Sequence, residues 1–154
     1  MSHEGIRIVT KEEQTRRQGE EDETRPLPRI AITPDKVRVL LTEGKGLEID
    51  WADGHKSAWG FAWLREACPC AHCVEERRQE RRRLGQPRPK PAELLPMYTP
   101  PPKPGSILPV GRYAIQFNWL DGHTGGIYSW DYLRRICQCR ECKFERDDTA
   151  GMPN

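Results

Sequence analysis

Cysteine is absent from most of this 154-residue sequence, because all six cysteines lie in two short clusters. The clusters occupy residues 68–73 and 137–142, and each has the spacing C-x-C-x-x-C. Neighbours as close as Cys68 and Cys70 pair poorly in a disulfide, whose geometry requires particular separations of the Cα atoms. Three thiols at such short spacing are instead typical of a shared metal site, so the sequence predicts metal binding rather than a disulfide framework.

Long apolar runs are also missing. Residues 1–25 are polar and charged, and no segment approaches the length of about 20 apolar residues that a membrane-spanning helix needs. No hydrophobic signal segment opens the sequence. We therefore expect a protein of the reducing cytoplasm with no membrane partner.

The apolar content is low for a fully packed domain, at 36% hydrophobic residues. Two segments account for the deficit, the polar start of the chain and residues 75–109, which hold nine of the fourteen prolines and a run of arginines. We expect a disordered charged tail at 1–28, one domain at 29–143 with a Pro/Arg-rich insert at 75–108, and a flexible tail at 144–154. The net charge of +2 favours no particular class of partner.

What is present is an internal repeat. Three motifs of the first half recur in the same order in the second half, and one inserted residue before Tyr132 restores the alignment. The pairs are Asp53-Gly54-His55 with Asp121-Gly122-His123, Trp63-Leu64-Arg65 with Tyr132-Leu133-Arg134, and Cys68-Pro69-Cys70-Ala71-His72-Cys73 with Cys137-Gln138-Cys139-Arg140-Glu141-Cys142.

The periodicity of each half predicts the same local structure. Apolar residues alternate over 47–51 and again over 113–119, which predicts half-buried strands. An Asp-Gly turn follows each strand, and we expect a tight hairpin with positive φ at both turn residues. Short returning strands and short helices then lead to the cysteines, over 55–59 and 61–67 in the first half and over 127–128 and 129–136 in the second.

Upstream, alternating residues over 30–32 and 37–41 would complete a β-meander, whereas 85–109 is expected to lack regular structure. The predicted fold class is α+β, with small antiparallel sheets, short helices and two pseudo-symmetric halves that each end in a C-x-C-x-x-C loop. Four tryptophans are expected to fill the core, Trp51, Trp63, Trp119 and Trp130.

A structural zinc ion takes four Cys or His ligands, so each cysteine triad leaves one position to fill. His55 and His123 stand at the same point of the two hairpins. Each could complete the triad of its own half or that of the other half. The crossed arrangement would stabilise the fold more, because it restricts a longer stretch of the unfolded chain. His72 has no counterpart in the second copy and is expected to be exposed.

At these motifs the sequence resembles the gamma-butyrobetaine hydroxylase-like N-terminal domain family, over about residues 30–142. The resemblance rests on 47–73, on 109–114 through Asp121-Gly122-His123, and on 126–130. It implies one zinc ion held by Cys68, Cys70, Cys73 and His123. The second triad, Cys137, Cys139 and Cys142, is not used by a single zinc ion, and we expect it to hold another metal together with His55.

The family also includes dioxygenases whose catalytic domain follows this one. The four histidines here offer no His-x-Asp/Glu pair for an iron facial triad, so we do not expect the hydroxylase activity or any other enzyme activity. Similar domains occur attached to Mrp-type P-loop ATPases that carry iron–sulfur clusters, although this sequence contains no P-loop.

The sequence thus predicts a non-catalytic, cytosolic, zinc-type metal-binding module for structural support and interaction with a protein partner, with a homodimer as one arrangement. The main alternative is an iron–sulfur cluster binding or transfer protein linked to Mrp-type assembly, because thiolates bind zinc and iron–sulfur centres alike. Two further alternatives are a thiol-redox or metal-dependent hydrolytic enzyme, which lacks an evident general base, and an RNA-binding module using Arg77–Arg83. Glutamates lie among those arginines and would pair with them on a solvated helix face, so we do not expect a nucleic-acid partner.

Overall fold

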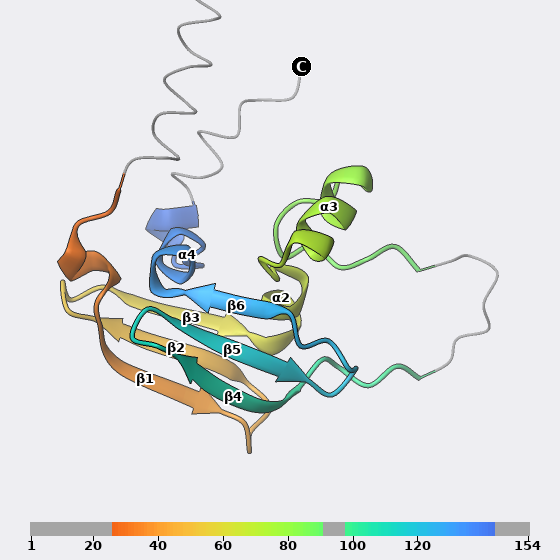
Figure 1. Cartoon of the computed structure of the whole chain (residues 1–154), viewed down its shortest axis with the longest axis horizontal. Coiled ribbons are helices and arrows are strands. Elements are labelled where there is room, and N and C mark those ends of the chain that lie inside the picture. The colour runs from red at the N-terminus through yellow and green to blue at the C-terminus, as the bar shows by residue number, and fades with distance from the viewer. Residues whose placement is uncertain (1–25, 91–97, 144–154) are drawn as a thin grey trace, which may run out of the picture.

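The computed structural model describes residues 26–90 and 98–143, so most of both predicted tails lies outside the described residues. The described chain forms two antiparallel three-stranded sheets with strand orders β1-β2-β3 and β4-β5-β6 (Figure 1). The first half contains η1 (Arg29–Ile32), β1 (Pro34–Leu40), β2 (Gly46–Trp51), β3 (Lys56–Gly60), α2 (Phe61–Glu66) and α3 (Ala71–Gln79). The second half contains β4 (Pro104–Val110), β5 (Ala114–Trp119), β6 (Gly126–Ser129) and α4 (Trp130–Arg135). The predicted α+β class with two pseudo-symmetric halves is confirmed.

The two halves repeat the same strand pattern. β2 and β5 are the central strands, and both show the burial order buried, buried, intermediate, buried, intermediate, buried. Each first strand carries an irregularity at the same point of its pairing, between Pro34 and Lys36 in β1 and between Pro104 and Ser106 in β4. The duplication therefore extends from the motifs to the register of the sheets.

The Asp-Gly hairpins form as three-residue loops. The amide of Gly54 donates to the Trp51 carbonyl at 2.9 Å, and the amide of Trp51 donates to the His55 carbonyl at 2.8 Å. Gly54 has φ +87 and Gly122 has φ +91, whereas neither aspartate has positive φ. The expectation of positive φ at both turn residues is wrong, because a three-residue loop needs only one left-handed residue after the turn.

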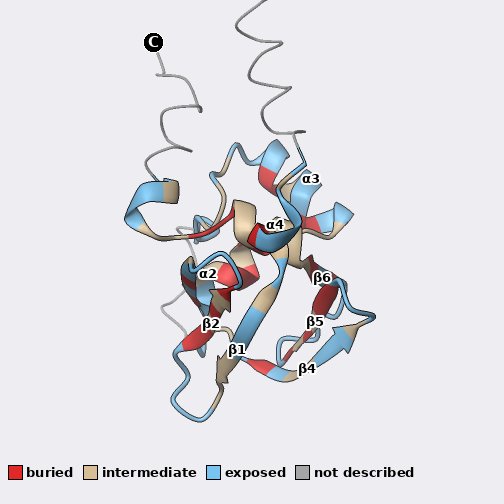
Figure 2. Cartoon of the chain, turned by 90° about the vertical axis from the view of Figure 1, so that its left-hand side faces the viewer, coloured by how far each residue is buried: buried red, intermediate tan, exposed pale blue. Residues whose placement is uncertain are grey.

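The core lies between the two sheets and the helices that follow them. The buried positions in Figure 2 include parts of β2, β5, β6 and α2, whereas β1 and β4 are mostly exposed or intermediate. Trp51 and Trp119 are buried as predicted, while Trp63 and Trp130 are partly buried and pack against the core. The rings of Phe61 and Trp119 meet edge to face across the halves, with centroids 6.5 Å apart.

Side chains of one half also donate to backbone carbonyls of the other. The Tyr128 hydroxyl donates to the Leu64 carbonyl at 2.6 Å, and the Trp59 indole donates to the Ile136 carbonyl at 2.9 Å. Buried Tyr and Trp polar groups need such partners. The two halves therefore share one core with specific polar contacts across it.

Two segments differ from the prediction. Residues 104–110 form strand β4, although 85–109 was expected to be irregular and the insert was expected to end at 108. Proline is tolerated here because β4 lies at the edge of its sheet. Residues 29–32 form the 3₁₀ helix η1 rather than a strand, with Ala31 buried and Ile30 exposed.

Candidate metal centre

The cysteines of the first half are placed by a loop that turns directly into a helix. Cys68 follows α2, Cys70 is the N-cap of α3, and Cys73 lies in the first turn of α3. The sulfur of Cys70 accepts a hydrogen bond from the amide of Cys73 at 3.4 Å. Cys139 and Cys142 repeat this bond at 3.4 Å in the second half.

The first cluster consists of Cys68, Cys70, Cys73 and His123. The Nε2 atom of His123 lies 3.2 Å from the Cys68 sulfur and 3.6 Å from those of Cys70 and Cys73. All four donor atoms lie within 4.8 Å of one another. The histidine comes from the hairpin of the second half, so the cluster is crossed.

The second cluster consists of Cys137, Cys139, Cys142 and His55. The Nε2 atom of His55 lies 3.2 Å from the Cys137 sulfur, 3.5 Å from Cys139 and 3.6 Å from Cys142. These donor atoms also lie within 4.8 Å of one another. The structure thus brings together all eight residues that the sequence nominated, in two groups of four that each join both halves.

Two aspartates hold the histidine hairpins in place. Asp53 accepts from the amide of His55, and Asp121 accepts from the amide of His123, both at 3.0 Å. Each aspartate also pairs with the arginine of the opposite half: Arg134 lies 2.9 Å from Asp53, and Arg65 lies 2.9 Å from Asp121. The repeated Asp-Gly-His and Trp/Tyr-Leu-Arg motifs therefore act together, and sequence reasoning missed this pairing.

The surroundings of the donor groups favour a mixture of protonation states. Burial raises the pKa of Cys68 to about 12 and that of Cys142 to about 12. Burial also acts to raise the pKa of Cys70, but hydrogen bonds from Cys73 outweigh it and lower the pKa overall. The pKa of His123 is lowered by burial and by the Arg65 guanidinium, which favours the neutral imidazole that binds metals.

Two arginines support the first cluster. Arg65 donates to the Cys73 sulfur at 3.8 Å, and Arg77 donates to the carbonyls of Glu66 and Cys68 at 2.9 Å. The expectation that the arginine run forms a solvated helix face is wrong for Arg77, which is buried. The sequence signal for this role of Arg77 is its position four residues after Cys73, which places the two side chains on the same face of α3.

A serine takes the supporting position at the second cluster. The Ser57 hydroxyl donates to the Cys137 sulfur at 3.0 Å and accepts from the Trp51 indole at 2.8 Å. The repeat places Gly126 at the equivalent position, where a Cβ would lie 3.1 Å from the Cys68 sulfur. The indole nitrogen of Trp119 is correspondingly buried without a hydrogen-bond partner. Sequence reasoning missed Ser57, because one serine in a strand carries no signal.

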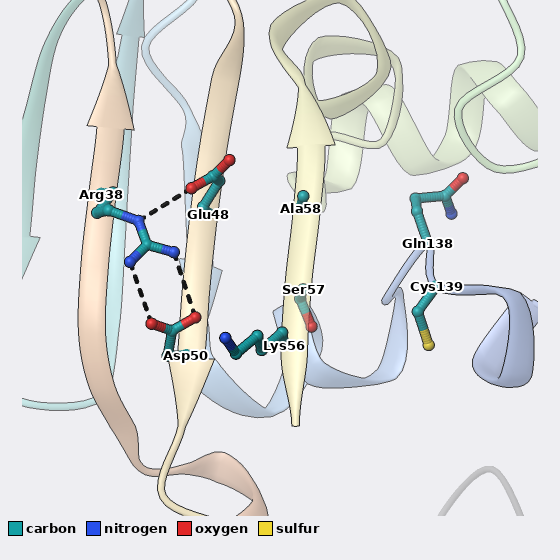
Figure 3. A pocket seen from close by; sticks show the side chains of 8 residues that line it. All are labelled: Arg38, Glu48, Asp50, Lys56, Ser57, Ala58, Gln138 and Cys139. Carbon is teal, nitrogen blue, oxygen red and sulfur yellow. Dashed lines mark hydrogen bonds and ion pairs between the residues drawn. The ribbon is translucent and has the colours of Figure 1, made fainter. Parts of the chain in front are cut away.

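A surface hollow reaches the second cluster. It is lined by Arg38, Glu48, Asp50, Lys56, Ser57, Ala58, Gln138 and Cys139. Figure 3 shows Arg38 of β1 bonded to Glu48 and Asp50 of β2, with Cys139 on the far side of β3. His72, as expected, is exposed and belongs to neither cluster.

Residues 39–134 match the family described as gamma-butyrobetaine hydroxylase-like, N-terminal. The chain belongs to this family. The matched residues include the first cluster and end before the cysteines at 137–142. The resemblance inferred from the motifs is therefore confirmed, while the second cysteine triad lies beyond the matched part.

Two proteins similar to this chain are a dioxygenase and a protein of unknown function. The chain is 31% identical over 109 residues to a gamma-butyrobetaine dioxygenase from Pseudomonas sp. (strain AK-1), covering 71% of this chain but 25% of that protein. It is also 31% identical to a crystal structure from Acidithiobacillus ferrooxidans, a protein of unknown function in the DUF971 family, covering 70% of this chain and 96% of that one with a TM-score of 0.48. The chain thus spans about a quarter of the dioxygenase.

Within the described residues, no helix is both long enough and apolar enough to cross a membrane.

Proposed function

We propose that this chain is a non-catalytic metal-binding module, in which one zinc ion at each cluster locks the two halves together. The observation that carries the proposal is the crossed donor set, three thiols from one half and a histidine from the other, formed twice. Three thiolates and one imidazole are a frequent ligand set of structural zinc sites.

The spacing of the donor atoms supports a single ion per cluster. Tetrahedral zinc with bonds of about 2.3 Å to sulfur and about 2.0 Å to nitrogen would place each sulfur about 3.5 Å from the nitrogen. The six sulfur-to-nitrogen distances are 3.2–3.6 Å. An iron–sulfur cluster would instead spread its four ligands over two or more iron atoms, so that not all of them could lie as close together as around one ion.

The crossed geometry gives the metal a structural task. Cys68 and His123 are separated by 55 residues, and His55 and Cys142 by 87 residues. A bond that closes such long loops restricts the unfolded chain more than a local one does. Metal binding is thereby coupled to the association of the two halves.

The donor count supports a role without catalysis. A catalytic zinc site keeps one position for water or substrate, whereas each cluster here supplies four protein donors. The proposal does not include the dioxygenase activity named for the Pseudomonas relative, because the chain spans a quarter of that protein and its four histidines form no His-x-Asp/Glu pair for an iron facial triad.

A protein partner and the reducing cytoplasm complete the proposal. All six cysteines have free thiols, which suits a reducing compartment. Leu108 and Ile127 are exposed on either side of Gln116 in the second sheet. We assign the contact with a protein partner to this exposed apolar pair.

The test is elemental analysis of protein purified without oxygen, together with its visible spectrum. We expect about two zinc ions per chain and no visible bands, since zinc has no d–d absorption. Cys70→Ser should remove one zinc and lower the melting temperature. Iron with acid-labile sulfide would favour the iron–sulfur alternative, and protein without metal would refute both.

A further inference from the structure

The two clusters repeat the same ligands but differ in their surroundings. Building on the proposed binding of zinc at both, we infer that the second cluster is an exchangeable metal site, while the first holds its metal permanently. Metal enters and leaves the second cluster at Cys139 and Cys142. Both ions thus join the two halves, but only the ion of the second cluster exchanges with solvent while the chain stays folded.

Burial is the first difference. Cys73 of the first cluster is only 3% exposed, whereas Cys142, the third cysteine of the second cluster, is partly exposed. Cys139 also lines the surface hollow, on the far side of β3 from Asp50 (Figure 3). Cys70 and Cys139 are both partly exposed, so the clusters differ at the third cysteine, where Cys142 is more open to a chelator than Cys73.

Charge compensation is the second difference. A divalent ion with three thiolates carries a net negative charge, which is costly to bury without a cation nearby. Arg65 donates to the Cys73 sulfur in the first cluster. Its counterpart Arg134 instead contacts Asp53 through both terminal nitrogens and lies over the Trp51 ring at 5.7 Å. Among the described residues, no arginine bonds a sulfur of the second cluster.

Ser57 is the third difference, and it fixes which end of the second cluster stays in place. Its hydroxyl supports the buried sulfur of Cys137, opposite the two accessible cysteines. The first cluster instead anchors its loop through Arg77, whose guanidinium holds the Cys68 carbonyl and ties α3 to the end of α2. These charged hydrogen bonds fix the loop of the first cluster, and the residue at the matching place of the second copy, Arg146, lies outside the described residues.

The experiment measures zinc release from the full chain mixed with excess 4-(2-pyridylazo)resorcinol, a coloured chelator. We expect two phases of equal amplitude whose rates differ by about tenfold or more, a range typical of changes around metal ligands. Cys142→Ser should abolish the fast phase, and Cys73→Ser should abolish the slow phase. The reverse assignment, or equal rates at both sites, would overturn the inference.

Ser57→Ala keeps all eight ligands, so it tests the assignment even if the cysteine variants fail to fold. It should accelerate only the fast phase, severalfold, and acceleration of the slow phase would contradict the assignment. If purification leaves one zinc per chain, that ion should persist in Cys142→Ser and be lost in Cys73→Ser, whereas the opposite result would refute the inference. Wild-type protein with no zinc would refute the proposed function itself, so the two failures are distinguishable.

Discussion

Asp121 performs two tasks with one carboxylate, because it caps the hairpin of His123 and pairs with Arg65 of the opposite half. The two contacts differ in strength. The hydrogen bond fixes the backbone beside a cluster histidine, whereas the ion pair involves a carboxylate that is half exposed. Exposed ion pairs contribute little because water screens them.

The substitutions Asp121→Ala and Asp121→Asn separate these tasks. Alanine removes both contacts and should lower the free energy of unfolding by about 1 kcal/mol. Asparagine can still accept from the His123 amide and should cost about 0.5 kcal/mol or less. Urea unfolding measures both values. Equal costs for the two variants would show that the ion pair, rather than the turn, carries the stability.

Tyr132 provides a pH-dependent contact between the halves. Its hydroxyl donates to the Ala67 carbonyl at 2.6 Å, and burial raises its pKa to about 12. The unfolded tyrosine ionises near pH 10, so this contribution to stability is complete below about pH 10 and is lost as the pH rises to about 12. Unfolding free energies measured over this range should fall less steeply for Tyr132→Phe than for the wild type.

Tyr113→Phe is the matched control for that slope. Tyr113 lies in the turn between β4 and β5 and its side chain is exposed. Its removal should leave the alkaline fall in stability unchanged. A fall that is equally steep in Tyr132→Phe and in the wild type would show that the buried hydroxyl has no part in it.

At the level of elements, the Asp-Gly hairpins determine where the histidines stand. Gly54 and Gly122 adopt φ values of +87 and +91, and a Cβ at either position would meet no atom within 4 Å. The cost of a substitution is therefore conformational. Gly122→Ala should destabilise the protein by about 1 kcal/mol, because L-residues are disfavoured in left-handed backbone.

Gly60→Ala is the control for this prediction. Gly60 precedes α2 with φ −72, and its Cβ would meet only the Lys45 carbonyl at 3.8 Å. Alanine there restricts the unfolded chain but replaces a residue favoured at an N-cap, so the net change should be no more than about 0.5 kcal/mol. Thermal unfolding of the two variants compares the costs. A loss in Gly60→Ala as large as in Gly122→Ala would contradict the conformational explanation.

The elements that sequence alone predicts are those whose pattern is local. The alternation over β2 and β5, the Asp-Gly turns and the Ser129 cap of α4, which accepts from the Tyr132 amide at 3.0 Å, can all be inferred from neighbouring residues. Strand β4 could not be predicted, because its prolines mask a strand that is fixed by pairing with β5. Local pattern cannot reveal a partner strand or the position of a lone serine such as Ser57.

At the scale of the whole molecule, two copies of one motif hold each other through reciprocal side-chain contacts. Each half gives the other a histidine, an arginine and aromatic hydrogen-bond donors, and the helices α2 and α4 lie beside the sheets from which they emerge (Figure 1). From the residues alone, local and crossed pairing of the histidines were equally open. The family resemblance implied the crossed pairing for His123, and three-dimensional structure extends the same arrangement to His55.

This interlocking predicts that metal removal weakens the molecule as a unit. If the free metal is about 100 times its Kd, its removal costs about 2.7 kcal/mol of unfolding free energy. Because His123 belongs to the second half and its three thiols to the first, His123→Ala should lower the melting temperature and reduce hydrogen-exchange protection in both sheets.

His72→Ala is the matched control, since His72 is exposed and outside both clusters. It should behave like the wild type, and both should lose stability when a chelator is added. Loss of protection confined to β4–β6 in His123→Ala would show that the halves are held together by their apolar core, with the metal serving only the hairpin of His123.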